Sequence, residues 1–189
     1  MPKAPRERIN LNLAVVAVLK MTLATNKPSH LCYIGLGSNL DNPKQQVIEA
    51  LNALDKIPNT ALLKHSSLYR SDPVGPPGQP DYINAVAALS THLEPERLLD
   101  ELQAIEQDHQ RIRKIHWGPR TLDLDIILFG SQIITTDRLT IPHPYAHERS
   151  FVLWPLAEIA PEDLQFPNGN TLTHLLVSNP LGTLEKISV

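Results

Sequence analysis

Asp123 and Asp125, two positions apart, are the residues of this sequence whose type and spacing point most clearly to chemistry. They lie in a stretch that otherwise has the apolar character of a buried strand, running to Phe129 and closed by Gly130. Because side chains alternate across a strand, we expect both carboxylates on one face and Leu124 on the other. Aspartate is a poor strand residue and like charges on one face repel, so this pattern predicts a neighbouring cation.

Three interpretations of this acidic pair differ in what neutralises it. It is an exposed strand face, or a structural ion pair with Arg120, or a metal site. Only a divalent metal accounts for both carboxylates, since Mg²⁺ is typically held by one or two carboxylates together with substrate phosphate oxygens. The densest positive stretch of the chain, residues 111–117, leads directly into this strand. Cations beside carboxylates suit a polyphosphate and its metal, so the sequence favours the third interpretation.

The elements that must position these groups follow an alternating order. Helical spacing and strand alternation predict a strand at 31–36 ending in a turn at 37–39, a helix from Pro43 to Ile57, a strand at 60–69, a strand at 82–89, a helix at 95–111 and the acidic strand. This is an α+β, ferredoxin-like βαββαβ core, an antiparallel sheet with both helices on one face. We expect an appended hairpin around Asp137 and C-terminal helices at 147–159, interrupted near Pro155, and at 172–177.

A second set of residues suits the binding of a flat ligand. Residues 71–80 contain four prolines and two glycines and predict a rigid loop, which is either a binding wall or a long connection. In the strand that follows, Tyr82 and Asn84 share a face, where they could stack on and hydrogen-bond a planar heterocycle. The alternative is a tyrosine that packs on the core with the asparagine at the rim, and this strand alone favours that alternative.

Length and composition bound the remaining possibilities. The 189 residues suit one domain, which we place at residues 31–189, with residues 1–30 as an N-terminal extension or a wrongly assigned start. The net charge of −3 gives no support for nucleic-acid or membrane-surface binding. The single cysteine, Cys32, excludes an intrachain disulfide and is expected to be buried. No stretch is long and apolar enough to span a bilayer, and we expect a cytoplasmic, monomeric protein.

Several blocks of this sequence, taken together and in order, resemble the hydroxymethyl-dihydropterin pyrophosphokinases of folate biosynthesis. The resemblance covers about residues 31 to 180. Its blocks are Gly35-Leu36-Gly37-Ser38-Asn39-Leu40, Tyr69-Arg70-Ser71-Asp72-Pro73-Val74-Gly75, Pro80-Asp81-Tyr82-Ile83-Asn84, Trp117-Gly118-Pro119-Arg120-Thr121-Leu122-Asp123-Leu124-Asp125-Ile126-Ile127-Leu128-Phe129-Gly130, Leu139-Thr140-Ile141-Pro142-His143-Pro144 and Arg149-Ser150-Phe151-Val152-Leu153-Trp154-Pro155-Leu156.

The resemblance implies that the chain transfers pyrophosphate from ATP to the hydroxymethyl group of hydroxymethyl-dihydropterin and releases AMP. It implies two Mg²⁺ ions at Asp123 and Asp125, with Arg111 and Arg120 as catalytic cations. It places the pterin against Ser71, Val74, Tyr82, Asn84, Trp117 and Phe151. It places ATP against Gln103, Glu106, Arg113, Arg120, Ile126, Arg138, Thr140, His143 and Arg149.

Two other functions compete with this one. A ferredoxin-like fold also hosts non-catalytic ligand-binding modules, so the fold alone decides nothing. Such a module has no need of an acidic pair flanked by Arg120. Another metal-dependent nucleotidyl or phosphoryl transferase with a different acceptor is the third candidate, and against it Tyr82, Asn84 and Phe151 favour a flat heterocycle as the acceptor.

Overall fold

The structure, a computed structural model, describes residues 28–75, 77–109 and 120–187. In chain order its elements are β1 (His30–Ser38), α2 (Pro43–Leu54), β2 (Thr60–His65), β3 (Leu68–Ser71), β4 (Tyr82–Thr91), α3 (Pro95–Asp108), β5 (Asp123–Phe129), β6 (Ile134–Thr135), β7 (Thr140–Ile141), η1 (Ala146–Glu148), α4 (Ser150–Ile159), α5 (Leu172–Ser178) and β8 (Glu185–Ile187). Nearly all of the extension expected at residues 1–30 lies outside the described residues.

The main sheet of the described residues has the strand order β5-β1-β4-β3-β8, with β2 also paired to β4. All of its pairings are antiparallel. The first and third strands of the predicted core therefore lie at the centre of the sheet, as a βαββαβ arrangement requires. Strands β6 and β7 form a separate hairpin, as expected.

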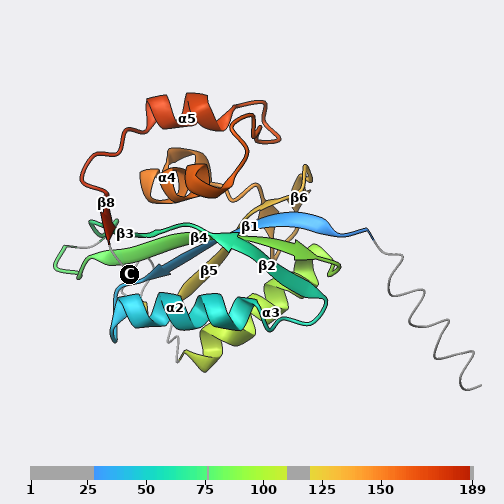
Figure 1. The fold of residues 1–189 in the computed structure, drawn as a ribbon, viewed down its shortest axis with the longest axis horizontal. Coiled ribbons are helices and arrows are strands. Elements are labelled where there is room, and N and C mark those ends of the chain that lie inside the picture. Colours follow the sequence, from blue (N-terminus) through green and yellow to red (C-terminus); the bar gives the residue numbers. More distant parts are fainter. Residues whose placement is uncertain (1–27, 76, 110–119, 188–189) are drawn as a thin grey trace, which may run out of the picture.

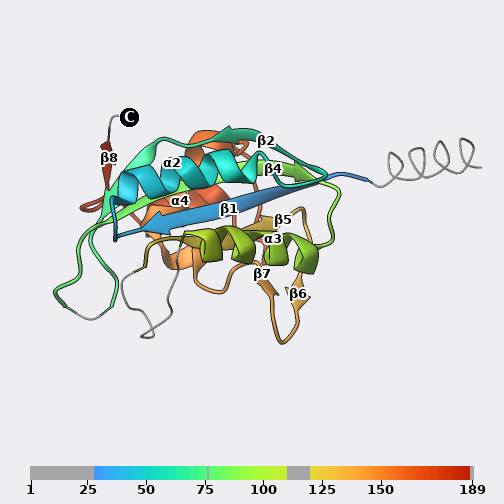
Figure 2. The same cartoon turned by 90° about the horizontal axis from the view of Figure 1, so that it is seen from below.

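Helices cover both faces of this sheet. Figure 1 shows α4 and α5 on one side and α2 and α3 on the other, and Figure 2 shows α2 and α3 lying along the sheet in the view from below. The α2–α3 side encloses one apolar core, which includes Leu36, Leu98 and Leu124, while the α4–α5 side encloses a second core around Val86 and Leu153. Side chains thus leave each central strand alternately into two cores, which fixes the register of the strands.

The strand alternation expected from the sequence is confirmed. In β4, Ile83 and Ala85 enter the α2–α3 core while Val86 enters the other core. In β5, Leu124 and Ile126 enter the α2–α3 core, so the positions between them face the α4 side. Cys32 is fully buried as expected, and burial raises the pKa of its thiol to about 12.

Three details of the expected fold are wrong. The strand expected at 60–69 is divided into β2 and β3. Between them, the Ser66 N–H donates to the Val86 carbonyl and the Ser66 hydroxyl oxygen accepts from the Val86 N–H, so a side chain replaces the regular strand pairing at this point. The turn expected at 37–39 begins later, since β1 continues to Ser38. Helix α4 also runs through Pro155 without interruption, because its apolar residues are buried against the sheet and tertiary packing outweighs the hydrogen bond that proline cannot donate.

The strand β8 was not expected from the sequence. It pairs with β3 through Leu68 and Ile187, so the end of the described chain extends the sheet. The segment before it approaches the proline-rich loop after β3, where the Thr183 hydroxyl donates a 2.7 Å hydrogen bond to Asp72. The C-terminal segment therefore forms part of the surroundings of that loop.

Candidate active site

Asp123 and Asp125 lie on one face of β5, as predicted, at the end of the sheet that α4 leaves uncovered. The intervening Leu124 is buried in the opposite core. On the neighbouring strand β1, Gly37 is in register with Asp123, and Gly35 is in register with Asp125. Both carboxylates therefore stand beside Gly35 and Gly37, a part of β1 that carries no side chains on this face.

Arg120 supplies one of the cations that the acidic pair was predicted to need. Its guanidinium makes an ion pair and hydrogen bond with the Asp123 carboxylate. The pKa of Asp125 is raised above the ordinary range of an aspartate, by burial first and then by Asp123 and Glu106, while Arg120 and Arg149 act in the opposite direction. Since 43% of the Asp125 side chain is exposed, solvent screens part of these effects. Among the described residues, the site thus concentrates negative charge that Arg120 and Arg149 only partly offset.

His143 approaches this acidic pair from the loop after β7. Its backbone N–H donates to Ile127 of β5 at 3.0 Å, which fixes the loop against the strand, and its Nε2 lies 3.8 Å from Asp125 Oδ2. Burial and the nearby Arg149 charge lower the pKa of His143 to about 4. The imidazole is therefore neutral near pH 7 and offers hydrogen-bonding groups rather than charge.

Arg149 brings a second guanidinium to the site from the residue before α4. It lies 5.2 Å from the ring centroid of Tyr145 and 5.6 Å from that of Phe151, within the range of cation–π attraction. Burial lowers its pKa, and the Asp125 and Asp123 charges act to raise it. Arg149 therefore joins the aromatic part of the site to the acidic part.

The second predicted group, Tyr82 and Asn84, lies on the other side of β1 and on the same face of the sheet. Asn84 is buried, is in register with Gly37, and donates a 2.9 Å hydrogen bond from Nδ2 to the Ser71 hydroxyl. Burial raises the pKa of Tyr82, and the charges of Arg120 and Asp123 also act on it. Asn84 and Asp123 are both in register with Gly37, so the two predicted sets of residues lie on either side of this residue on one face of the sheet.

A cavity of about 450 Å³ opens beside this second group. Three residues predicted from the resemblance to hold the pterin, Ser71, Val74 and Phe151, contribute to its wall. The wall also includes Leu181 to Leu184 from the C-terminal segment, which no local pattern in the sequence associates with the site. Its volume suits a small planar molecule.

Asn39 is a further functional candidate that the side-chain analysis of the sequence did not single out. It is only 2% exposed. Its backbone N–H donates to the Arg120 carbonyl at 3.0 Å, and its Oδ1 accepts from the Arg120 N–H at 2.8 Å. Its Nδ2 donates to the Pro80 carbonyl at 3.1 Å, two residues before Tyr82. One side chain thus fixes the backbone of both halves of the site. The signals in the sequence were its position directly after a glycine-bearing strand and its place in the first block of the family resemblance, neither of which assigned it a role.

The remaining residues assigned to ATP by resemblance are less uniformly placed. Glu106 is 4% exposed and accepts a 2.8 Å hydrogen bond from the Leu124 N–H, so it holds the backbone between the two aspartates. The Ile126 side chain is buried in the α2–α3 core, which leaves only its backbone for a ligand. Gln103 is half-buried on α3, and Thr140 is exposed on β7.

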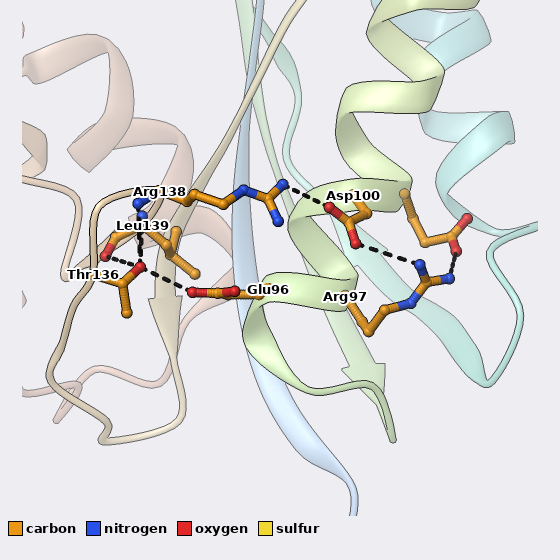
Figure 3. Close-up of polar contacts among 7 residues, drawn as sticks. Glu96, Arg97, Asp100, Thr136, Arg138 and Leu139 are labelled. Carbon is orange, nitrogen blue, oxygen red and sulfur yellow. Dashed lines mark hydrogen bonds and ion pairs between the residues drawn. The ribbon is translucent and has the colours of Figure 1, made fainter.

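Arg138 is held by helix α3 rather than by the acidic pair. Figure 3 shows its guanidinium pointing to Asp100, where the Nη2–Oδ1 distance is 2.6 Å. In the same view Thr136 donates to Glu96 of α3 at 3.0 Å. These contacts attach the β6–β7 hairpin to α3 and fix the strand from which the His143 loop departs.

Three predicted site residues, Arg111, Arg113 and Trp117, lie outside the described residues. Within the described part of the chain, no three His, Cys, Asp or Glu side chains form a group that could hold a metal ion by themselves. Magnesium at Asp123 and Asp125 therefore needs further oxygen ligands, which substrate phosphates and water can supply. None of the helices in the described part of the chain combines the length and apolar character needed to cross a membrane.

Comparisons with known proteins identify the family to which this chain is similar. The family model of 7,8-dihydro-6-hydroxymethylpterin-pyrophosphokinase matches residues 33–161. The chain is 50% identical over 155 residues to a Pseudomonas aeruginosa protein named 2-amino-4-hydroxy-6-hydroxymethyldihydropteridine pyrophosphokinase, covering 82% of this chain and 95% of that one. A Haemophilus influenzae protein of the same name is 54% identical over 144 residues, covering 76% of this chain and 89% of that one.

Solved structures provide an independent comparison of the fold. A Plasmodium falciparum HPPK-DHPS triple mutant with pteroate matches with a TM-score of 0.67 at 14% sequence identity, over 88% of this chain. This chain spans 48% of that longer chain. At this identity the match concerns the fold alone, and it confirms the expected ferredoxin-like architecture.

Proposed function

The chain belongs to the 7,8-dihydro-6-hydroxymethylpterin-pyrophosphokinase family, and we propose that its activity depends on Mg²⁺ held by Asp123 and Asp125. The reaction of the family is pyrophosphate transfer from ATP to hydroxymethyl-dihydropterin in folate biosynthesis. The observation that carries the proposal is the placement of the two residue sets: the acidic pair and Tyr82 with Asn84 flank the bare part of β1 on one face of the sheet. The family match does not favour a non-catalytic binding module.

The donor set suits magnesium. Hard cations prefer oxygen ligands, and the two carboxylates share a face without a third protein carboxylate arranged to complete a site in the described residues. Bound Mg²⁺ would neutralise charge on the phosphates of ATP. The Arg120–Asp123 ion pair shows that the acidic pair attracts a cation, and the neighbouring charges of Asp123 and Glu106, after burial, raise the pKa of Asp125. We extend the proposal to two ions, which the family resemblance implies.

The phosphates of ATP lie, in this proposal, over the acidic end of the sheet between Arg120 and Arg149. These guanidiniums come from the approach to β5 and from the start of α4, so they approach from different elements. Neutral His143 adds hydrogen-bonding groups without adding charge. The resemblance also implies ATP contacts from Gln103, Glu106, Arg113, Ile126, Arg138 and Thr140. Glu106 would act through the β5 backbone that it holds. Arg111 is, by the same resemblance, a catalytic cation together with Arg120.

The acceptor lies on the β4 side. By the family resemblance, a pterin stacks between the rings of Tyr82 and Phe151, and the buried Asn84 can form hydrogen bonds with its edge. Ser71 and Val74 line the cavity together with Phe151, and Trp117 completes the set by resemblance. The Asn84–Ser71 hydrogen bond fixes the orientation of the asparagine before a ligand arrives.

The chemical step needs positioning and charge neutralisation more than covalent catalysis. The hydroxymethyl oxygen of the pterin attacks the β-phosphorus of ATP, loses its proton, and the bond between the α-phosphate-bridging oxygen and the β-phosphorus breaks to release AMP. Arg120 is placed to stabilise charge that develops on the phosphates, because its backbone is held by Asn39 and its guanidinium by Asp123. The monomeric state and the cytoplasmic location stay predictions.

One assay tests the proposed function directly. Purified protein is incubated with ATP, Mg²⁺ and 6-hydroxymethyl-7,8-dihydropterin, and we expect pterin-dependent AMP formation that stops on addition of EDTA and returns with excess Mg²⁺. ADP in place of AMP would contradict pyrophosphate transfer, and AMP formation that persists in EDTA would contradict the metal. As a matched test of the acceptor side, Tyr82→Ala should weaken pterin binding far more than the binding of a non-hydrolysable ATP analogue.

A further inference from the structure

The central strand of the site carries no side chain at the point where the two substrates must meet. Gly37 of β1 is in register with Asn84 on one side and with Asp123 on the other. Neighbouring strands lie about 4.8 Å apart, so the backbones of Asn84 and Asp123 are separated by roughly 10 Å across Gly37. The surface between the acceptor residues and the acidic pair is therefore bare backbone.

The fold itself does not require glycine at this position. Gly37 is not one of the described residues with a left-handed backbone conformation. Its backbone conformation is therefore one that any residue can adopt. A Cβ atom at this position would lie 3.5 Å from Asn84 Oδ1 and 3.8 Å from Tyr82 Cδ1, which are ordinary van der Waals contacts. Alanine also suits the interior of a strand better than glycine does. Neither packing nor backbone conformation explains the missing side chain.

Gly35, two residues earlier on the same face, is different. A Cβ atom at Gly35 would lie 3.1 Å from Ile127 Cδ1, closer than most real contacts, and Ile127 is buried in the core beneath α4. Packing alone therefore explains glycine at position 35. The contrast leaves Gly37 as the position whose bare backbone needs a functional reason.

We propose that Gly37 determines acceptor access: its missing side chain leaves room for the hydroxymethyl arm of the pterin to cross β1 and reach the phosphates over Asp123. This inference rests on the proposed function, because it places the pterin at Tyr82 and Asn84 and the phosphates at the acidic pair. The Cβ of any other residue would project on this face, toward Asn84 and Tyr82, and into the path of the arm. One methyl group suffices, since in-line attack tolerates displacements of only a fraction of an ångström.

The test compares Gly37→Ala with Gly35→Ala. For Gly37→Ala we expect a melting temperature equal to or above that of the unchanged chain, together with a loss of roughly 10–200-fold in kcat/KM for the pterin, the range that one added methyl group produces in a tight site. The Kd of a non-hydrolysable ATP analogue should stay within about twofold. Gly35→Ala should instead lower the melting temperature, because Ile127 must move.

Three results would overturn the inference. The first is a kcat/KM of Gly37→Ala within about twofold of the unchanged chain, and the second is an equal loss of ATP-analogue and pterin affinity. The third is a fall in melting temperature as large as that of Gly35→Ala, because the space at Gly37 would then serve packing. If the unchanged chain forms no AMP, the proposed function fails, and the Kd of the pterin alcohol for the unchanged chain and Gly37→Ala still decides the steric claim.

Discussion

Two carboxylates on the α4 side of the sheet, Glu158 and Asp125, lie in opposite electrostatic surroundings. Glu158, on α4, accepts hydrogen bonds from the Ser67 N–H at 2.6 Å, the Tyr69 hydroxyl at 2.7 Å and Lys186 at 2.6 Å. Burial raises its pKa, but these donors outweigh burial and lower it to about 2. At Asp125, burial and then the neighbouring charges of Asp123 and Glu106 raise the pKa, and among the described residues no set of donors comparable to that at Glu158 offsets them.

Glu158 is thus a carboxylate that stabilises the fold, whereas the ionised form of Asp125 is destabilised by its surroundings. The donors to Glu158 come from two regions: Tyr69 lies in β3 and Ser67 directly before that strand, while Lys186 lies in β8. These interactions therefore join α4 to the edge of the sheet. At Asp125 the nearest acidic groups, Asp123 and Glu106, raise the free energy of the ionised form. Acids concentrated at cost to stability indicate a site selected for binding cations or for catalysis.

The largest effect that follows from this comparison is on turnover. Asp125→Asn keeps the shape of the side chain and removes one metal-binding charge. We expect pterin-dependent AMP formation to fall on the order of 10³-fold, the scale found when a catalytic electrostatic group is removed. The melting temperature should stay equal or rise, because repulsion from Asp123 is relieved. Steady-state assays and thermal unfolding of the same preparation measure both quantities.

Asp163→Asn is the matched control for this substitution, since Asp163 is exposed and remote in sequence from the acidic strand. It should change neither turnover nor stability. A large loss of stability in Asp125→Asn would mean that Asp125 resembles Glu158 after all, and the distinction between the two groups would break down.

The next effect concerns the positioning of Arg120 by Asn39. Asn39→Ala removes the acceptor for the Arg120 N–H and the donor to the Pro80 carbonyl. Because a misplacement of about 1 Å can cost on the order of 100-fold, we expect kcat to fall by this amount while the KM for ATP changes little. Asn52→Ala, on the exposed face of α2, is the control for the loss of an asparagine side chain.

A double variant distinguishes positioning from a general structural role. If Asn39 acts through Arg120, then Asn39→Ala should add little to the loss of kcat already caused by Arg120→Ala. Losses that multiply in the double variant would show that Asn39 supports the site by another route, and a purely structural role would appear as a lower melting temperature instead.

The local parts of this architecture could be predicted from the sequence because each depends on a short-range pattern. Alternation predicted that Asp123 and Asp125 share one face of their strand, and that Tyr82 and Asn84 share one face of theirs. The structure brings both pairs to the same side of the sheet. The interpretation of Tyr82 as a core residue was favoured from its strand alone, because the sequence does not show that the uncovered end of the sheet lies beside it.

The interactions between distant segments could not be predicted. The Arg120–Asn39 hydrogen bond joins residues 81 positions apart, and the Asp72–Thr183 bond joins residues 111 apart. The strand β8 has only three residues, too few for a periodic signal. Such pairings depend on the assembled fold, which explains why the C-terminal wall of the cavity was missed.

On the stability side of the comparison, Glu158→Ala should lower the free energy of unfolding by about 1–3 kcal/mol, the cost of leaving buried donors without their acceptor. Its side chain is only 24% exposed, and Ser67 and Tyr69 both lose their partner. Turnover at a temperature well below the transition should stay unchanged. Urea unfolding measures the difference, and Glu162→Ala, an exposed glutamate after α4, is the control.

The smallest effect is the acid dependence of that difference, and it tests whether charge is what Glu158 contributes. Its pKa of about 2 in the folded chain lies below the value of about 4.3 for an unfolded glutamate, so the folded state holds the ionised form. A depressed carboxyl pKa contributes stability that is fully present above the unfolded value and is lost as the pH falls toward the folded value. The stability difference between the unchanged chain and Glu158→Ala should therefore be largest near neutral pH and shrink steadily as the pH falls from about 5 to about 2.5. Urea unfolding at several pH values across this range measures it. A difference that stays constant would mean that Glu158 acts through packing and neutral hydrogen bonds, and the contrast with the acidic pair would then rest on geometry rather than on charge.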